Sequence, residues 1–272
     1  MNSNFYQKNI IITGGSSGIG EALVNQLVDL GSTVWIIARN EEKILQIKSR
    51  LDKKADQVQY FLVDVQNYQE LLKISEHLKS QRITIDGLIN SAGVTYPAEF
   101  DTLDIEKYHW LMDINYFGTV NCVLAFLPLM EPGAFIVNIS SMAGVLGVYG
   151  YSGYGASKYA VRGFSDVIRS ELKPKKIHVS VVFPPDTDTP QLAFEEKIKP
   201  AITKKIAGTA KVLSASQVSN EIIKGISKKK YLIIPGVESK LLFHASNLLG
   251  PLVYPIMDLM VNQARRDQDR NK

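Results

Sequence analysis

The chain has 272 residues, of which 45% are hydrophobic and 21% charged. This composition suits one large or two small globular domains with a full core. The net charge of +4 is too small to predict nucleic-acid binding by itself. The single cysteine, Cys122, excludes an intramolecular disulfide and favours a reducing compartment. The four scattered histidines predict no metal site. The short polar N-terminus predicts no signal peptide, so we expect a cytoplasmic protein.

Strand-like and helix-like segments alternate along most of the chain. Strands are predicted at residues 9–13, 33–38, 58–63, 85–90, 134–139, 177–182 and 231–234. Helices are predicted at residues 18–30, 41–54, 68–80, 105–130, 154–172 and 216–227. This alternation is typical of right-handed crossovers between parallel strands. We therefore predict an α/β fold, a single doubly wound, Rossmann-like parallel sheet of about seven strands with helices on both faces. It should occupy residues 1–238, and residues 239–272 should form an apolar C-terminal extension.

A glycine-rich loop, T-G-G-S-S-G-I-G at residues 13–20, joins the first predicted strand to the first predicted helix. Gly14, Gly18 and Gly20 would let the backbone turn sharply and approach a pyrophosphate at the helix N-terminus, where free N–H groups favour an anion. A tight turn without a ligand is the alternative. The position between a strand and a helix favours dinucleotide binding.

The ends of the next strands carry side chains that bear on the choice of cofactor. Arg39 ends the second strand, and Lys43 follows four residues later. A base at this position accommodates the 2′-phosphate of NADPH, whereas an acid would bind the ribose of NADH. Asp64 ends the third strand and can bond an adenine amino group. We predict NADPH. The alternatives are that Arg39 and Lys43 are surface charges and that Asp64 is a simple cap.

A tyrosine and a lysine one helical turn apart, Tyr154 and Lys158 in Y-G-A-S-K, share one helix face. A nearby ammonium lowers the pKa of a phenol, so such a tyrosine can act as an acid for a ketone. Ser141 follows the fifth strand and can hold a carbonyl oxygen. Asn115 is a poor helix former within a predicted helix, which favours a polar role.

These motifs together, T-G-x3-G-x-G, N-S-A-G (90–93), Asn115, Ser141 and Y-x3-K, resemble the short-chain dehydrogenase/reductase family over roughly residues 8–235. The resemblance implies hydride transfer from a nicotinamide to a ketone. Tyr154 would be the general acid, and Ser141 would orient the carbonyl. Lys158 would bind the ribose and lower the tyrosine pKa, and Asn115 would hold a water linking Lys158 to solvent. The predicted cofactor contacts are Gly14, Ser16, Ser17, Gly18, Ile19, Gly20, Arg39, Lys43, Asp64, Val65, Asn90, Ala92, Gly93, Tyr154, Lys158, Pro184, Thr187 and Thr189.

The segment P-P-D-T-D-T after the sixth strand departs from the family's P-G-x-x-x-T, because Pro185 replaces the glycine. It resembles the 3-ketosphinganine reductase branch, which implies a long-chain amino-ketone lipid as the substrate and NADPH as the reductant. Asp186 or Asp188 could pair with the substrate ammonium. Alternatively, the two aspartates cap the turn and the next helix. Another hydrophobic ketone (a steroid, a retinoid or a 3-ketoacyl chain) and a non-catalytic scaffold are the other functions considered.

The extension contains a mostly apolar stretch at residues 241–261, with basic residues at both ends. It could pack on the domain or a second subunit, lie in a membrane interface, or span a bilayer, although its polar residues and prolines make a poor span. In a eukaryote the membrane would be the cytosolic face of the endoplasmic reticulum. Relatives in the resembled family are often oligomers, so we also expect a homo-oligomer.

Overall fold

The computed structural model describes residues 3–207 and 211–270. Its centre is a seven-stranded parallel sheet in the order β3-β2-β1-β4-β5-β6-β9. The strands are β1 (Asn9–Thr13), β2 (Thr33–Ala38), β3 (Val58–Leu62), β4 (Gly87–Asn90), β5 (Phe135–Ile139), β6 (His178–Val182) and β9 (Leu232–Ile233). The predicted fold class is confirmed. Most of these strands read as continuous apolar runs because they are buried on both faces.

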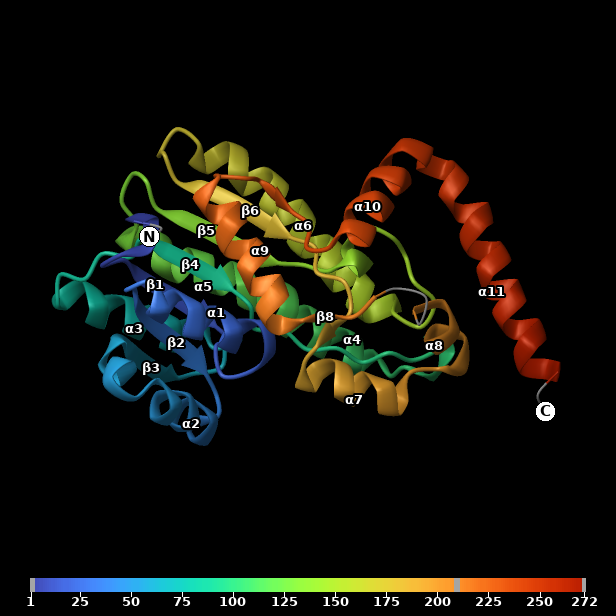
Figure 1. Cartoon of the computed structure of the whole chain (residues 1–272), viewed down its shortest axis with the longest axis horizontal. Coiled ribbons are helices and arrows are strands. Elements are labelled where there is room, and N and C mark those ends of the chain that lie inside the picture. The colour runs from blue at the N-terminus through green and yellow to red at the C-terminus, as the bar shows by residue number, and fades with distance from the viewer. Residues whose placement is uncertain (1–2, 208–210, 271–272) are drawn as a thin grey trace.

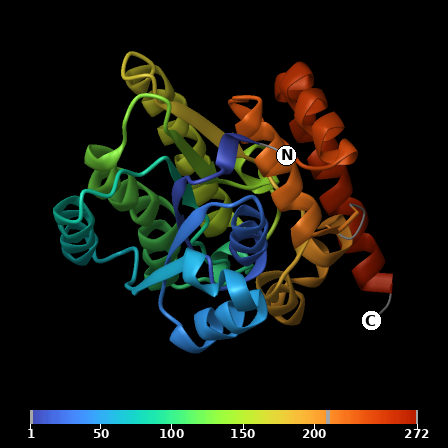
Figure 2. The ribbon, with the colours of Figure 1, turned by 60° about the vertical axis from the view of Figure 1, so that its left-hand side comes forward.

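Helices cover both faces of the sheet (Figures 1 and 2). One core cluster packs α1 (Gly18–Asp29), α2 (Glu41–Leu51) and α9 (Ala215–Ser227) against one face. The other packs α3 (Tyr68–Ser80), α5 (Gly118–Phe126) and α6 (Ser152–Leu172) against the opposite face. The chain runs from β1 outward to β3 and then returns to β4 on the other side of β1. The strand order therefore reverses between β1 and β4, where a ligand crevice is expected.

The helix predicted over 105–130 is divided into shorter elements. They are α4 (Ile105–Met112), a π-helical turn (Asp113–Phe117), α5 and a 3₁₀ turn (Leu127–Leu129). Within the described residues, Ile105–Leu129 is the one helical stretch long and apolar enough to cross a membrane, and half of it is buried. Because Cys122 and Phe126 pack in the core beside α3, we assign it as a helix of the domain interior.

Two helices follow β6 that the sequence reasoning did not predict, α7 (Pro190–Ile198) and α8 (Ala201–Ala207). Thr189 caps α7, since its Oγ1 accepts a hydrogen bond from the N–H of Leu192 at 3.3 Å. The alternative in which an aspartate caps this helix is therefore wrong. The Thr-Pro pair at 189–190 is itself a helix-start signal. A short parallel pair, β7 (Thr187–Asp188) and β8 (Leu213–Ser214), ties this segment to the start of α9.

The C-terminal extension forms α10 (Val237–Leu249), a 3₁₀ turn (Gly250–Leu252) and α11 (Val253–Arg270). Figure 1 shows both helices at the end of the molecule far from β2 and β3, with α11 beside α8. A spanning helix needs about 20 continuous apolar residues. The break at Gly250 and Pro251 interrupts the stretch 241–261, so the structure does not support the bilayer-spanning alternative.

Candidate active site

A cavity of about 610 Å³ opens at the carboxyl ends of β1, β4, β5 and β6. The loops that follow these strands form one end of it, around Gly14, Ala92, Ser141 and Pro184. The other end is formed by apolar side chains of the C-terminal helices, Leu242, Met257 and Met260. The cavity therefore joins the predicted cofactor loop to the apolar extension.

The glycine loop is shaped by close backbone contacts. Gly14 has a positive φ of 67°, and a Cβ there would lie 2.7 Å from the Cα of Ala92. A Cβ on Gly20 would lie 2.3 Å from the carbonyl oxygen of Gly14. Any side chain at either position would therefore displace the backbone. The loop leaves the N-terminus of α1 open toward the cavity, which fits a pyrophosphate.

The loops after β1 and β4 are also held together by side chains. The Thr13 hydroxyl accepts hydrogen bonds from the N–H groups of Ser91 and Ala92 at 3.1 and 3.0 Å. Asn90 is buried and donates to the Asn138 side chain at 2.9 Å. Its own Oδ1 has no hydrogen-bond partner among the described residues. An unpaired buried acceptor beside this loop also fits a ligand with hydroxyl groups.

Arg39 and Asp64 contact each other at the ends of β2 and β3. A guanidinium nitrogen of Arg39 lies 3.2 Å from a carboxylate oxygen of Asp64. Both side chains reach solvent, and Lys43 is exposed on the first turn of α2. These residues lie beyond the mapped cavity, on the side where the adenosine end of a dinucleotide would extend from the glycine loop. Val65 is buried against Gly118. The cofactor contacts predicted for Arg39, Lys43, Asp64 and Val65 stay predictions.

Three of the four predicted catalytic residues line the cavity, and the fourth, Asn115, is buried behind them. Tyr154 and Lys158 lie on α6, and the Lys158 Nζ is 5.6 Å from the centre of the Tyr154 ring. Both are buried. Ser141 follows β5 and lines the same cavity. Asn115 lies in the π-helical turn, and its side chain bonds both backbone groups of Val94 at 2.8 and 2.9 Å.

Asn115 thus has the polar role predicted for it, with partners that the sequence did not reveal. Besides Val94, its Nδ2 donates to the Ser157 hydroxyl at 2.9 Å. It therefore ties the loop after β4 to the helix that carries Tyr154 and Lys158. A water held between Asn115 and Lys158 stays a prediction.

The pKa of Tyr154 departs from expectation. Burial raises it above its ordinary value, and the nearby carboxylate of Glu195 raises it further, while hydrogen bonding to Ser141 acts in the opposite direction. Lys158 is not among the groups that shift this pKa most, so its lowering of the Tyr154 pKa stays a prediction. The Lys158 ammonium donates to the Ile139 carbonyl at 3.0 Å. A raised pKa keeps the phenol protonated at neutral pH, which is the form an acid requires.

Lys158 carries a stability cost that can be measured. Burial lowers its pKa from 10.5 to about 8, which corresponds to about 3 kcal/mol against folding at neutral pH. Because the folded-state pKa is depressed, the cost is complete below pH 8 and disappears as the pH rises toward 10.5. Lys158→Met removes this cost but also loses one hydrogen bond, which is worth about 1 kcal/mol. We therefore expect the variant to raise the free energy of unfolding by about 2 kcal/mol at pH 7. Little gain should remain at pH 9.5. Urea unfolding at both pH values measures this, and a variant less stable than wild type at pH 7 would contradict it.

The segment after β6 supplies part of the cavity wall, and its predicted contacts with the cofactor stay predictions. Pro184, Thr187 and Thr189 line it together with Asp186. A Cβ on Gly18 would lie 3.0 Å from the Thr189 methyl group, so this segment closes over the glycine loop. Asp188 is exposed in the β7–β8 pair and does not line the cavity. Of the two aspartates predicted to meet substrate, the structure therefore places only Asp186 at the site.

Sequence reasoning missed several polar residues of the cavity. They include Tyr151, Gln191 and Glu195, and also Ser91, Ser140, Lys211, Glu238 and Ser239. Gln191 and Glu195 lie one turn apart on α7, the helix that was not predicted. The helix-start signal at Thr189 and Pro190 would have placed both on one face. Nothing in the sequence shows that this face meets the cavity.

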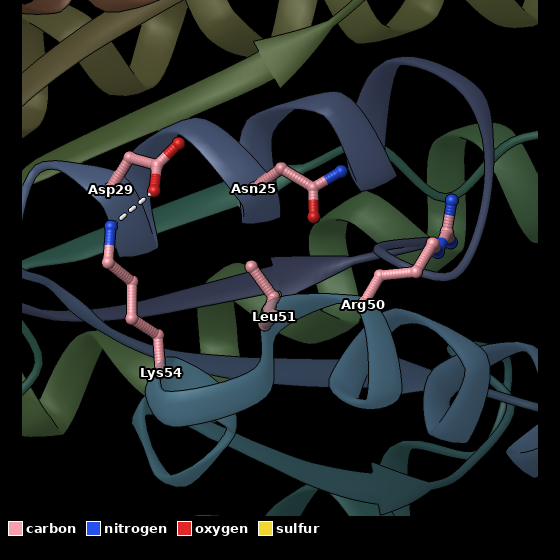
Figure 3. A pocket seen from close by; sticks show the side chains of 5 residues that line it. All are labelled: Asn25, Asp29, Arg50, Leu51 and Lys54. Atoms are coloured by element: carbon pink, nitrogen blue, oxygen red, sulfur yellow. Dashed lines mark hydrogen bonds and ion pairs between the residues drawn. The ribbon is translucent and has the colours of Figure 1, made fainter.

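A second hollow, of about 390 Å³, lies between α1 and the end of α2 (Figure 3). An ion pair between Lys54 and Asp29 at 2.5 Å crosses its edge, and Leu51 forms part of its floor. Both charged groups are partly exposed. No predicted site residue lies there, so the chemistry belongs to the larger cavity.

Comparison with known proteins agrees with this geometry. Residues 8–198 match a family model described as short chain dehydrogenase. The chain is 36% identical over 222 residues to the mouse (Mus musculus) 3-ketodihydrosphingosine reductase, covering 79% of this chain and 67% of that one. It is 35% identical over 277 residues to the 3-ketodihydrosphingosine reductase of Dictyostelium discoideum, covering 93% of this chain and 82% of that one.

Solved structures share the fold at lower identity. A short chain dehydrogenase from Burkholderia cenocepacia in complex with NADP has a TM-score of 0.78 and 20% identity, covering 93% of this chain and 98% of that one. A Burkholderia phymatum short chain dehydrogenase/reductase in complex with NAD has a TM-score of 0.79 and 22% identity, with coverage of 90% and 96%. Because these two hold different cofactors, the likeness does not choose between NADP and NAD.

Proposed function

The chain belongs to the short chain dehydrogenase family and is an oxidoreductase, and from this premise we propose that it uses NADPH to reduce the 3-keto group of 3-ketosphinganine to sphinganine. The observation that carries the proposal is the cavity itself. It places Tyr154 and Ser141 between the glycine loop and the apolar wall of α10 and α11. The names of two relatives that align over most of this chain point to the same substrate.

The reaction requires a hydride and a proton. The nicotinamide cofactor, when bound, supplies the hydride to the carbonyl carbon. Tyr154, protonated at neutral pH, donates the proton to the carbonyl oxygen, and the Ser141 hydroxyl holds that oxygen by a hydrogen bond. Lys158 would bind the ribose hydroxyl groups at the other side of Tyr154. Asn115 fixes the distance between the loop after β4 and α6 through Val94 and Ser157.

The cavity also suits a long aliphatic chain. Beyond Tyr154 its walls include Leu146, Val148, Leu242, Met257 and Met260. Apolar walls of this kind favour an alkyl chain over a polar substrate, and methionines adapt to irregular shapes. A steroid, a retinoid or a 3-ketoacyl chain would meet the same walls, so another hydrophobic ketone is the second candidate. We propose residues 239–272 as an extension that completes the substrate cavity of the catalytic domain formed by residues 1–238.

A panel of ketones separates these candidates. The oxidation of NADPH is followed at 340 nm with 3-ketosphinganine, its amine-free analogue, a steroid ketone and a 3-ketoacyl thioester. We expect the highest kcat/KM with 3-ketosphinganine. A higher kcat/KM with the steroid or the thioester would replace the proposed substrate. The absence of oxidation with every ketone would favour a non-catalytic protein.

We further propose that α10 and α11 bring the enzyme to a membrane surface. Leu248, Leu252 and Leu259 are 89%, 65% and 69% exposed. Lys240 and Arg265 near the two ends of this surface would favour anionic lipid. The substrate is itself a membrane lipid, so its entry beside Leu242 would need no passage through water. If the host is eukaryotic, the cytosolic face of the endoplasmic reticulum is the membrane we propose.

The variant Leu248→Asp/Leu252→Asp/Leu259→Asp tests membrane contact. Full burial of a leucine contributes about 1.5 kcal/mol, so even half of this from three leucines amounts to about 2 kcal/mol, and we expect partition onto anionic vesicles to fall at least about 30-fold. Leu45→Asp, at an exposed leucine of α2, is the control. Sedimentation with vesicles measures binding, and equal binding of wild type and the triple variant would contradict the proposal.

We also propose a homo-oligomer formed through α5 and α6. Three apolar side chains in this region are about half exposed. They are Phe117 just before α5, Leu124 on α5 and Val167 on α6, with exposed fractions of 50%, 52% and 54%. Exposed apolar side chains on neighbouring helices favour contact with a second copy. Sedimentation of the same samples without vesicles gives the mass that decides this.

A further inference from the structure

The polar part of the substrate cavity contains a buried carboxylate that the proposed reaction does not use. Glu195 lies on α7 with 5% of its surface exposed, and it lines the cavity together with Tyr151 and Tyr154. The walls nearby are aromatic and apolar. A carboxylate in such a place must find a hydrogen-bond donor or a cation.

The donors around Glu195 satisfy it only in part. The Tyr151 hydroxyl donates to its Oε2 at 2.5 Å, and the Gln191 side-chain nitrogen lies 3.4 Å from its Oε1. Both donors are neutral, as is the buried Thr95 hydroxyl, which also acts on Glu195. The ammonium of Lys199 lies 3.7 Å from Oε2, beyond hydrogen-bond distance.

Lys199 is held more closely by two other carboxylates. Its Nζ lies 2.7 Å from Glu196 and 3.4 Å from Asp186. One buried ammonium therefore serves three carboxylates, and the cluster keeps an excess of negative charge. Burial raises the pKa of Glu195, while Tyr151 and Lys199 act in the opposite direction, so the charge is compensated only partly. A second cation would complete the cluster.

Glu195 is also well placed relative to the reacting group. The rings of Tyr151 and Tyr154 lie 5.6 Å apart, and Glu195 bonds the first while its charge acts on the second. In an amino ketone such as 3-ketosphinganine, the carbon that bears the amine is bonded to the carbonyl carbon. With the carbonyl oxygen on Tyr154, the ammonium must lie close by, on the same side of the cavity.

We propose that Glu195 receives the ammonium group of the substrate and so selects 2-amino ketones over other hydrophobic ketones. This inference rests on the proposed function and names the group of the chain that recognises the substrate head. Asp186 is less suited, because its partner is Lys199 and its side chain is 34% exposed. Asp188 is exposed and lies outside the cavity. An ammonium bound at Glu195 would also offset the negative charge that opposes ionisation of Tyr154.

Glu195→Gln tests the proposal, because it keeps the shape and removes the charge. Kinetics are measured with 3-ketosphinganine and with its amine-free analogue, 1-hydroxyoctadecan-3-one. We expect kcat/KM for the amino ketone to fall at least about 30-fold, mainly through KM, because a buried charge-assisted pair is lost. The value for the analogue should not fall, because this ketone makes no ion pair with Glu195 and the variant also removes the negative charge that raises the pKa of Tyr154. Glu171→Gln, an exposed glutamate at the far end of α6, is the matched control, and Asp186→Asn should have a smaller effect than Glu195→Gln.

A second measurement uses the wild-type enzyme alone and does not depend on the variant folding. Inhibition by sphinganine is compared with inhibition by octadecane-1,3-diol, which lacks the amine. We expect sphinganine to bind at least about tenfold more tightly. Equal inhibition by the two compounds, or an equal loss of both activities in Glu195→Gln, overturns the role of Glu195.

The two proposals fail in different ways. If the wild type reduces 3-ketosphinganine and Glu195→Gln does so equally well, the role of Glu195 is wrong and the proposed function stands. If the wild type reduces the amine-free ketone and not 3-ketosphinganine, the proposed function fails and the ammonium site with it.

Discussion

Tyr154→Phe is expected to reduce kcat/KM for ketone reduction about 1000-fold, which lies within the range attributed to general acids. The substitution keeps the ring that packs among Leu111, Ala143 and Tyr151, so the fold should be unchanged. It removes the proton donor nearest the carbonyl oxygen. Because burial raises the pKa of Tyr154, the wild-type residue is protonated at neutral pH. The variant therefore loses this proton donor completely at pH 7.

Tyr159→Phe is the matched control. Tyr159 lies on the same helix, is 42% exposed and does not line the cavity. Its kcat/KM should equal that of the wild type. The two variants are compared by initial rates at pH 7 together with their thermal unfolding midpoints. Turnover of Tyr154→Phe within tenfold of the wild type would show that another group supplies the proton.

Arg39→Asp is expected to reverse the choice of cofactor. Arg39 offers a guanidinium that can bind the 2′-phosphate of NADPH, whereas an aspartate repels that phosphate and can accept a hydrogen bond from the ribose of NADH. Asp64, whose carboxylate lies 3.2 Å from Arg39, would add to the repulsion. We expect the ratio of kcat/KM for NADPH over NADH to fall at least about 100-fold.

Lys53→Asp provides the control for the change of charge, since Lys53 is exposed after the end of α2. Its ratio of NADPH to NADH activity should stay close to that of the wild type. Kinetics with each cofactor at a fixed ketone concentration measure both variants. A wild type that prefers NADH, or a ratio unaltered by Arg39→Asp, would remove the assignment of NADPH.

Much of the fold could be predicted because it rests on local patterns. Apolar runs such as Asn9–Thr13 and Phe135–Ile139 can form only buried strands or buried helix segments, and their short length favours strands. The helix α7 is not predicted from periodicity, because its apolar residues form no clear stripe, although Thr189 and Pro190 are a helix-start signal. The break in the helix around Asn115 was missed because a π-helical turn depends on tertiary contacts with Val94 and Ser157, which periodicity does not show.

The residues of the site could be predicted from the sequence, but their electrostatic interactions could not. Tyr154, Lys158 and Ser141 do come together, because a strand end and one helix face bring them to the same edge of the sheet. Asn115 reaches them from the π-helical turn through its bond to Ser157. The pKa of Tyr154 could not be predicted, since it depends on burial and on Glu195, which is 41 positions away along the chain. The contribution of Leu242, Met257 and Met260 to the cavity likewise depends on the bend at Gly250.

The most direct test of the proposed reaction uses NADPH deuterated at the nicotinamide C4 and unlabelled 3-ketosphinganine. The product is examined by mass spectrometry after incubation with the wild type and with Tyr154→Phe. We predict sphinganine that carries one deuterium at C3, formed by the wild type and nearly absent with the variant. If the wild type formed no labelled sphinganine while it transferred deuterium to another ketone of the panel, that result would contradict the proposed function.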